Sequence, residues 1–302
     1  MEHTKIAIIG AGAVGATTAY ALMLRNIAAE IILIDINKKR CEGEVLDLSD
    51  ALSFSRASKI KKGTTKDTRG ANIIIICAGA KQKPGQKREE LLAINKKVVT
   101  SIIKDLKPIN PHAIIIIVTN PVDVMTYFAQ QVSDLPTGQI FGTGTFLDTQ
   151  RIRRLVAQTL HIADQSVHAY IIGEHGDTQF AAWSSASIAG RPITEFPQIN
   201  KNMLDQFSLI TRKKANEIIT CKGATFFGIA TCVSAMCENI IFDRKYVMPL
   251  STYIPEFDAC MSIPAVLGIK GIEKTMEAPL NQEEKKLFEK SGKKLRDIIE
   301  KA

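Results

Sequence analysis

The sequence predicts an α/β fold, with a doubly wound parallel sheet in the N-terminal half and an α+β domain after it. Three observations favour this class. Short β-branched runs alternate with helical patterns over the first 145 residues, which is typical of parallel strands connected by helices. A glycine-rich segment, 10–15, directly follows the first run, and the second run ends in Asp35. Because the alternation stops near residue 145, we expect one domain over 1–145 and another over 146–302.

The N-terminal elements follow from composition and spacing. Continuous runs of isoleucine and valine indicate strands that are buried on both faces of a parallel sheet. Helices are indicated where apolar residues recur every three or four positions, as do Leu91, Ile94, Val98, Ile102 and Leu106. The expected strands are 5–9, 31–34, 73–76 and 114–118, and the expected helices run from the glycine segment to about Arg25, over 37–52 and over 89–106.

The glycine segment has the spacing of a dinucleotide-binding turn. Gly10 allows a tight turn, Gly12 lets the backbone approach a pyrophosphate, and Gly15 lets the helix pack closely on the strand. The free N–H groups of the helix N-terminus attract the phosphates. Asp35 is placed to accept hydrogen bonds from ribose hydroxyls, and its charge would repel a 2′-phosphate. The segment therefore predicts an NAD site rather than an NADP site.

The C-terminal half begins with a helix and a short strand-like run. The helix contains Asp148, Arg151 and Arg153, and the run 167–172 leads into a glycine-flanked turn that carries His175. A segment at 183–189, a long amphipathic stretch through 215–242 and a terminal helix over 282–301 follow.

A histidine in a loop is more often without a task than catalytic. Asp148 and Arg151 change that interpretation for His175. A carboxylate that orients the imidazole, a guanidinium that binds an anionic substrate and a bound hydride carrier are the parts needed to oxidise a hydroxy acid.

Two loops should lie at the carboxyl ends of the strands, where such sheets bind ligands. The first, 79–88, contains glycines and a proline and leads into a helix, so it is either a mobile lid carrying Arg88 or a solvated, lysine-rich loop. The second contains Asn120 and Pro121. Asn120 either holds a cofactor or substrate oxygen or simply starts the next helix.

Charge and cysteine usage exclude several classes of protein. The formal net charge is +8, but the lysines are scattered in small groups without interleaved aromatic residues, so we expect solvated faces rather than a nucleic-acid surface. Six widely spaced cysteines indicate reduced thiols and a reducing compartment. The apolar run 6–24 superficially resembles a membrane anchor, but its glycines favour a strand, a turn and a buried helix. We expect a cytoplasmic protein that binds neither membrane nor metal.

The chain resembles the lactate/malate dehydrogenase family, and the bacterial L-lactate dehydrogenases in particular, over nearly its whole length. Five motifs carry the resemblance, in order along the chain: the glycine segment 10–15, residues 82–88, residues 118–121, residues 148–151 and the turn 173–177.

The resemblance implies reversible hydride transfer between NADH and pyruvate. His175 would donate the proton during reduction, Asp148 would fix and stabilise the imidazole, and Arg88 would polarise the substrate carbonyl. Arg151 would bind the substrate carboxylate through two hydrogen bonds. Gln82, Asn120 and Thr225 would also line the substrate pocket, and the implied cofactor contacts are Gly10, Gly12, Val14, Gly15, Asp35, Arg40, Gly79, Ala80, Val118, Asn120 and Thr143.

Substrate choice depends on Gln82. Malate enzymes of the family have arginine at this position, which pairs with the second carboxylate of the substrate. A neutral glutamine cannot form that pair, so pyruvate and L-lactate are favoured. Malate dehydrogenase and a branched-chain L-2-hydroxyacid dehydrogenase are the alternatives within the family. A non-catalytic NAD-sensing protein is the alternative outside it.

Arg153 and His168 match positions at which bacterial lactate dehydrogenases bind fructose 1,6-bisphosphate between subunits. The resemblance therefore implies an allosteric homotetramer that acts in glycolysis and fermentation. The alternative is an exposed helix arginine and a strand histidine without a ligand.

Overall fold

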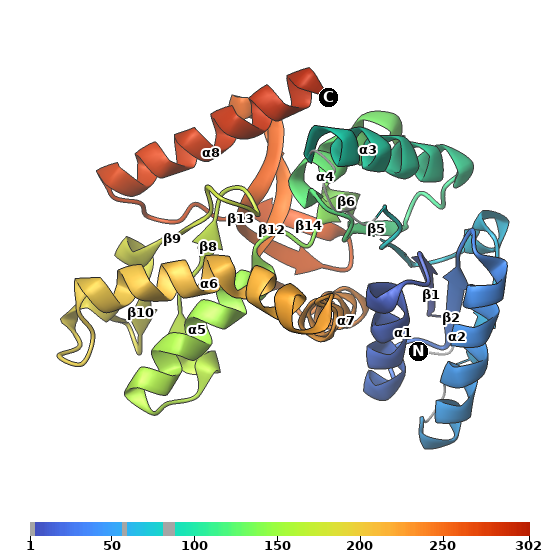
Figure 1. The fold of residues 1–302 in the computed structure, drawn as a ribbon, viewed down its shortest axis with the longest axis horizontal. Coiled ribbons are helices and arrows are strands. Elements are labelled where there is room, and N and C mark those ends of the chain that lie inside the picture. The colour runs from blue at the N-terminus through green and yellow to red at the C-terminus, as the bar shows by residue number, and fades with distance from the viewer. Residues whose placement is uncertain (1–3, 56–58, 81–87) are drawn as a thin grey trace.

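A single large sheet forms the centre of the molecule (Figure 1). The computed structural model describes residues 4–55, 59–80 and 88–302, and at Arg88 only the backbone. Six neighbouring strands, from β3 to β6, are parallel, and the last three are antiparallel. Across the sheet the order is β14 (Gly271–Thr275), β13 (Ala259–Gly268), β12 (Tyr246–Ile254), β6 (Ile140–Gly142), β5 (Ile114–Ile117), β4 (Ile73–Ile76), β1 (Lys5–Ile9), β2 (Glu30–Ile34) and β3 (Lys59–Lys62).

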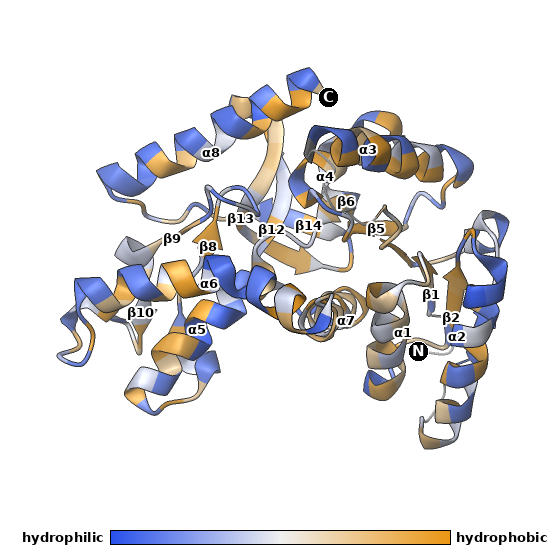
Figure 2. Ribbon diagram, viewed as in Figure 1, coloured by the Kyte–Doolittle hydropathy of each residue, from blue (hydrophilic) through white to orange (hydrophobic). Residues whose placement is uncertain are grey.

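Helices cover both faces of this sheet. The alternation of side chains along a strand separates two cores: Ile6 and Ile8 belong to one, and Ala7 and Ile9 to the other. The parallel strands are therefore apolar on both faces, and β5 is accordingly coloured as hydrophobic in Figure 2. Helices α1 (Ala13–Arg25), α2 (Lys38–Ala51) and α7 (Phe227–Ile241) cover the first face, and α3 (Arg88–Asp105), α4 (Val122–Val132) and α8 (Gln282–Lys301) cover the second.

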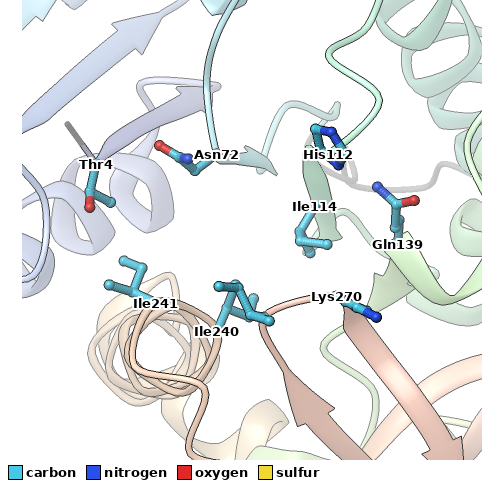
Figure 3. Close-up of a pocket in the computed structure, with 9 residues that line it drawn as sticks. Thr4, Asn72, His112, Ile114, Gln139, Ile240, Ile241 and Lys270 are labelled. Carbon is cyan, nitrogen blue, oxygen red and sulfur yellow. The ribbon is translucent and has the colours of Figure 1, made fainter.

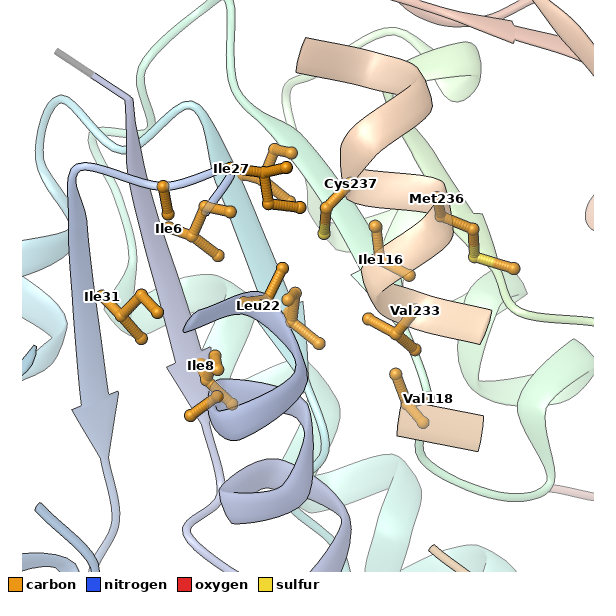
Figure 4. Close-up of a cluster of buried hydrophobic side chains, with 14 of the residues drawn as sticks. Ile6, Ile8, Leu22, Ile27, Ile31, Ile116, Val118, Val233, Met236 and Cys237 are labelled. Atoms are coloured by element: carbon orange, nitrogen blue, oxygen red, sulfur yellow. The ribbon is translucent and has the colours of Figure 1, made fainter. Parts of the chain in front are cut away.

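The first core joins residues from the two halves of the chain. Leu22 of α1 and Val233 and Cys237 of α7 pack over the same strands (Figure 4). Each fully buried side chain of this size contributes roughly 1.5–3 kcal/mol. The packing of α7 on α1 therefore attaches the C-terminal half firmly to the N-terminal strands.

A third core lies apart from the large sheet. It is built from α5 (Phe146–Leu160), α6 (Lys201–Lys222) and a small antiparallel sheet of β7 (Val167–His168), β10 (Ser187–Ile188) and β11 (Arg191–Pro192). A separate hairpin pairs β8 (Ile171–Ile172) with β9 (Phe180–Ala181).

The predicted α/β class with a doubly wound parallel sheet is confirmed, although strands of the C-terminal half, β12 to β14, extend the same sheet. Of the apolar face predicted for the helix at 89–106, Leu106 is buried and Ile102 packs against the core, but the rest of the face is displaced by about one position. Leu92, Val99 and Ile103 are buried, whereas Ile94 is 41% exposed. Helix α3 has two adjacent apolar stripes, and helical spacing alone does not tell which one faces the sheet. The amphipathic stretch 215–242 is broken where Gly223, with φ +81°, ends α6.

The carboxyl ends and the amino ends of the parallel strands have different surroundings. The order in which the chain adds strands reverses between the parallel neighbours β1 and β4, so the loops after these strands diverge at their carboxyl ends and leave room for a ligand. At the opposite, amino-terminal edge lies a pocket of about 550 Å³ (Figure 3), lined in part by Thr4, Asn72, His112 and Lys270. None of the predicted site residues that the structure describes lines this pocket.

Other sequence expectations concern membranes, metals and thiols. Within the described ranges, none of the helices combines the length and apolar composition needed to cross a bilayer. The same part of the chain contains no group of three or more His, Cys, Asp or Glu side chains placed to hold a metal ion. All six cysteines are free thiols, and four of them are buried.

Candidate functional site

The turn between β8 and β9 presents His175 at the surface of the C-terminal half. Gly173 begins the turn with φ +91°, and its backbone pairs with that of Ser262 in β13. A Cβ atom at Gly173 would lie 2.6 Å from Ser291 Oγ of α8, so this close approach requires glycine. The side chain of His175 remains 31% exposed.

Asp148 joins His175 to Arg151. It lies in the first turn of α5, and its side chain is only 3% exposed. Its Oδ2 atom lies 2.9 Å from His175 Nδ1, and its Oδ1 atom accepts a hydrogen bond of 2.9 Å from Arg151 Nη1. Among the described residues, Asp148 Oδ2 and His175 Nδ1 have no other hydrogen-bond partner. The carboxylate therefore favours a proton on Nδ1 and leaves Nε2 for a ligand.

The pair changes the acidity of both partners. Burial opposes ionisation of Asp148, but the hydrogen bond and charge of His175, followed by Arg151, lower its pKa below the ordinary 3.8. Burial opposes the charged imidazole, but the hydrogen bond and charge of Asp148, followed by the charge of Asp123, raise the pKa of His175 above 6.5. Asp148 therefore stabilises the fold above pH 3.8, and this contribution is lost as the pH falls through its lowered pKa. The stabilisation that His175 contributes to the fold is fully present below pH 6.5 and is lost as the pH rises through its raised pKa.

Arg151 is positioned to bind an anion. Its side chain is 16% exposed. In the described part of the chain its one hydrogen bond uses Nη1, which leaves the other guanidinium N–H groups for a ligand. A guanidinium with free N–H groups binds a carboxylate through two parallel hydrogen bonds, which a lysine cannot do.

Two further carboxylates hold the His175 turn, and the sequence interpretation gave neither of them a role. Asp123, in the first turn of α4, accepts a hydrogen bond of 2.7 Å from the backbone N–H of His175. The buried Glu174 accepts one of 2.8 Å from Lys294 Nζ of α8, and its own N–H donates to Ser291 Oγ. The turn is therefore attached to helices on two sides.

Asn95 is a second residue that the sequence interpretation missed. It is 2% exposed on the sheet-facing side of α3. Its Oδ1 atom accepts from Ala80 N–H at 2.7 Å, and its Nδ2 atom donates to Asn120 O at 2.8 Å. Asn95 thus ties together the loops that follow β4 and β5. Its role could have been suspected from the sequence, because Asn95 is a polar residue on the apolar side of an amphipathic helix.

The glycine segment fits a dinucleotide. Gly10 has φ +109°, and a Cβ atom at Gly15 would lie 1.8 Å from Gly10 O. Gly12, in contrast, has nothing within 4 Å of its Cβ position and provides no side-chain cap for α1. Open space therefore lies in front of unpaired helix N–H groups, where a pyrophosphate would bind. Asp35 borders this space and accepts hydrogen bonds from Ala11 N–H and Asn37 N–H.

The remaining predicted residues are distributed as follows. Gln82 lies outside the described residues, and the side chain of Arg88 does too. Thr225 lies between α6 and α7, three residues before Gly228, which packs against Leu147 next to Asp148. Most of the other predicted cofactor contacts lie at the carboxyl ends of the strands: Gly79 and Ala80 follow β4, Val118 and Asn120 follow β5, and Thr143 follows β6. Val14 lies in α1. Arg40 forms an exposed ion pair with Glu44.

Arg153 lies in α5 and His168 in β7, two elements that pack in the same core. Arg153 Nε donates a hydrogen bond of 2.9 Å to Ala169 O, the residue after His168. Its guanidinium also lies 5.0 Å from the ring centre of Tyr170, and burial lowers its pKa below the ordinary value. His168 is exposed in β7, opposite Ser187.

Comparison with known families accounts for nearly the whole chain. Residues 4–142 match the family described as lactate/malate dehydrogenase, NAD binding domain. Residues 145–302 match lactate/malate dehydrogenase, alpha/beta C-terminal domain.

Individual relatives agree with these matches. The chain is 45% identical to L-lactate dehydrogenase A of Rhizopus oryzae over 296 residues, covering 98% of this chain and 92% of the relative. It is 41% identical to an L-lactate dehydrogenase of Acetivibrio thermocellus, covering 98% and 96%. Among solved structures, a lactate dehydrogenase from a Medee basin deep-sea metagenome library superposes with a TM-score of 0.96 at 33% identity, covering 100% of this chain and 99% of that one.

Proposed function

Because the chain belongs to the lactate/malate dehydrogenase family, we propose that it catalyses reversible hydride transfer between NADH and pyruvate, giving L-lactate and NAD⁺. The observation that supports the catalytic assignment best is the shared carboxylate of Asp148, which lies 2.9 Å from His175 Nδ1 and bonds to Arg151 at the same distance. An acid/base group and an anion-binding group are thereby held side by side, as reduction of a keto acid requires.

The residues of the chain have distinct roles in the proposed reaction. Bound NADH supplies the hydride that the substrate C2 receives. Arg151 binds the substrate carboxylate through its free N–H groups, which fixes the orientation of the carbonyl. His175 donates the Nε2 proton to the carbonyl oxygen as C2 is reduced, and accepts it back during lactate oxidation. Asp148 stabilises the imidazolium and keeps the second ring proton on Nδ1.

Three further residues complete the proposed pocket. Arg88 polarises the carbonyl as negative charge develops on its oxygen, an effect typically worth about 3 kcal/mol for one well-placed donor. Asn120 contacts the nicotinamide or the substrate from the end of β5, where Asn95 holds its backbone. Thr225 closes the side of the pocket formed by the turn between α6 and α7.

The first test is an absorbance assay of NADH loss with pyruvate. His175→Ala removes the proton donor and is expected to lower kcat by about 10²- to 10⁴-fold, with NADH affinity within a few-fold of the unaltered protein. If the unaltered protein binds NADH without consuming it in the presence of pyruvate, it is a non-catalytic NAD-sensing protein and the proposal fails.

Gln82 is proposed to select pyruvate over a dicarboxylate. Gln82→Arg supplies a partner for the second carboxylate of oxaloacetate and should raise kcat/KM for that substrate by about 10²-fold, the value of one charge-assisted pair. Steady-state kinetics with pyruvate, oxaloacetate and 2-oxoisocaproate measure this change. An unaltered protein that already prefers oxaloacetate would be a malate dehydrogenase. A preference for 2-oxoisocaproate would indicate a branched-chain L-2-hydroxyacid dehydrogenase.

We also propose that Arg153 and His168 bind the phosphates of fructose 1,6-bisphosphate between subunits of a homotetramer. The proximity of Arg153 to the residue after His168 supports this assignment. The free state of all six cysteines supports a cytoplasmic location, where regeneration of NAD⁺ by pyruvate reduction serves glycolysis and fermentation.

The effector proposal is tested by kinetics across pH. Added fructose 1,6-bisphosphate should lower the apparent KM for pyruvate, and Arg153→Ala should abolish this response while leaving activity at saturating pyruvate nearly unchanged. Indifference of the unaltered protein to the effector at every pH would rule out the site.

A further inference from the structure

Asp123 is a buried carboxylate that the roles assigned above do not use. It is 2% exposed, and its Oδ2 atom accepts the backbone N–H of His175 at 2.7 Å. Asp123 and His175 are separated by 52 residues in sequence, so only the fold brings them together. Asp123 lies in the first turn of α4, three residues after Asn120.

The groups around Asp123 come from three other elements. The turn after β8 contributes His175 and Glu174, β12 contributes the hydroxyl of Ser251, and β13 contributes the thiol of Cys260. His175 itself also faces Asp148 and Arg151 of α5. Burial raises the pKa of Asp123 to about 6, so the carboxylate is mostly ionised at neutral pH.

His175 is therefore fixed at two separate points. Asp148 faces the ring at Nδ1, and Asp123 binds the main chain at the amide nitrogen. A single contact at the ring would still allow the turn to shift and to carry the imidazole with it. Displacement of a catalytic group by about 1 Å can cost about 10²-fold in rate.

A purely architectural role for Asp123 does not explain its charge. The N-terminal end of α4 favours a negative side chain, but an asparagine would accept the same N–H without the cost of burying an ionised carboxylate. The charge of Asp123 acts on His175, whose protonated form it favours. The contact and the charge thus both act on the proposed acid/base residue.

We propose that Asp123 is a positioning residue for the reaction: it holds the main chain of His175 so that the imidazole meets the substrate oxygen in one orientation, and its negative charge favours the protonated ring. This inference rests on the proposed role of His175 as the acid/base group.

The experiment compares three variants of the full chain. Asp123→Ala removes both the acceptor and the charge, Asp123→Asn keeps the acceptor alone, and Asp134→Asn removes an exposed carboxylate just beyond α4 that pairs with Lys107. For each variant we would measure kcat with pyruvate across pH, the primary deuterium isotope effect with deuterated NADH, and NADH affinity by fluorescence.

Asp123→Ala should lower kcat by about 10- to 100-fold and raise the isotope effect, with NADH affinity within about threefold of the unaltered protein. Asp123→Asn should keep kcat within a few-fold at low pH but shift the midpoint of the pH profile downward, because the charge that favours the imidazolium is gone. Asp134→Asn should change none of these quantities.

Unchanged kcat and isotope effect in Asp123→Ala would overturn the proposal. A loss of NADH affinity as large as the loss of kcat would also overturn it, because that result would indicate a structural role alone. If Asp123→Ala does not fold, Asp123→Asn decides, and an unshifted pH profile contradicts the proposal. A His175→Ala variant that retains full turnover would instead refute the acid/base assignment itself, so the two failures are distinguishable.

Discussion

The contacts of Asp148 are the constraint on which the rest of the site depends. One buried carboxylate uses one oxygen for His175 and the other for Arg151, so the positions of the proposed acid/base group and the proposed anion-binding group are not independent. A buried charge of this kind is costly unless it is paired and hydrogen-bonded. The loss of either partner would leave the other misplaced and the carboxylate uncompensated, which in the proposed reaction couples proton transfer to substrate binding.

The fold provides this arrangement by bringing distant elements to one edge. The loops that follow β1, β4 and β5 lie at the carboxyl ends of parallel strands, where the glycine segment and Asn120 are found. The His175 turn is attached to α4 through Asp123 and to α8 through Glu174 and Lys294. The C-terminal helix α8 therefore helps to hold the His175 turn, which lies near the middle of the sequence.

Much of this could be predicted from the sequence, for identifiable reasons. The isoleucine runs and the glycine spacing indicate parallel strands and a dinucleotide turn through local pattern alone, and the terminal helix over 282–301 has the bounds expected. The pairing of Asp148 with His175 was expected from the residue types and implied by the family resemblance, because no local pattern connects residues so far apart. The roles of Asp123 and Asn95 were missed, because a buried polar residue acts through contacts that only the folded chain creates. The short strands β3 and β6 were also missed, having too few apolar residues to indicate a strand.

A titration of the histidine ring by NMR, with isotope-labelled histidine and the His175 signal assigned from its absence in His175→Ala, tests the shared carboxylate most directly. We expect a midpoint above 6.5 in the unaltered protein and a clear fall of that midpoint in Asp148→Asn, because the charge that stabilises the imidazolium is lost. A midpoint at or below 6.5 in the unaltered protein, or one that Asp148→Asn leaves in place, would contradict this expectation.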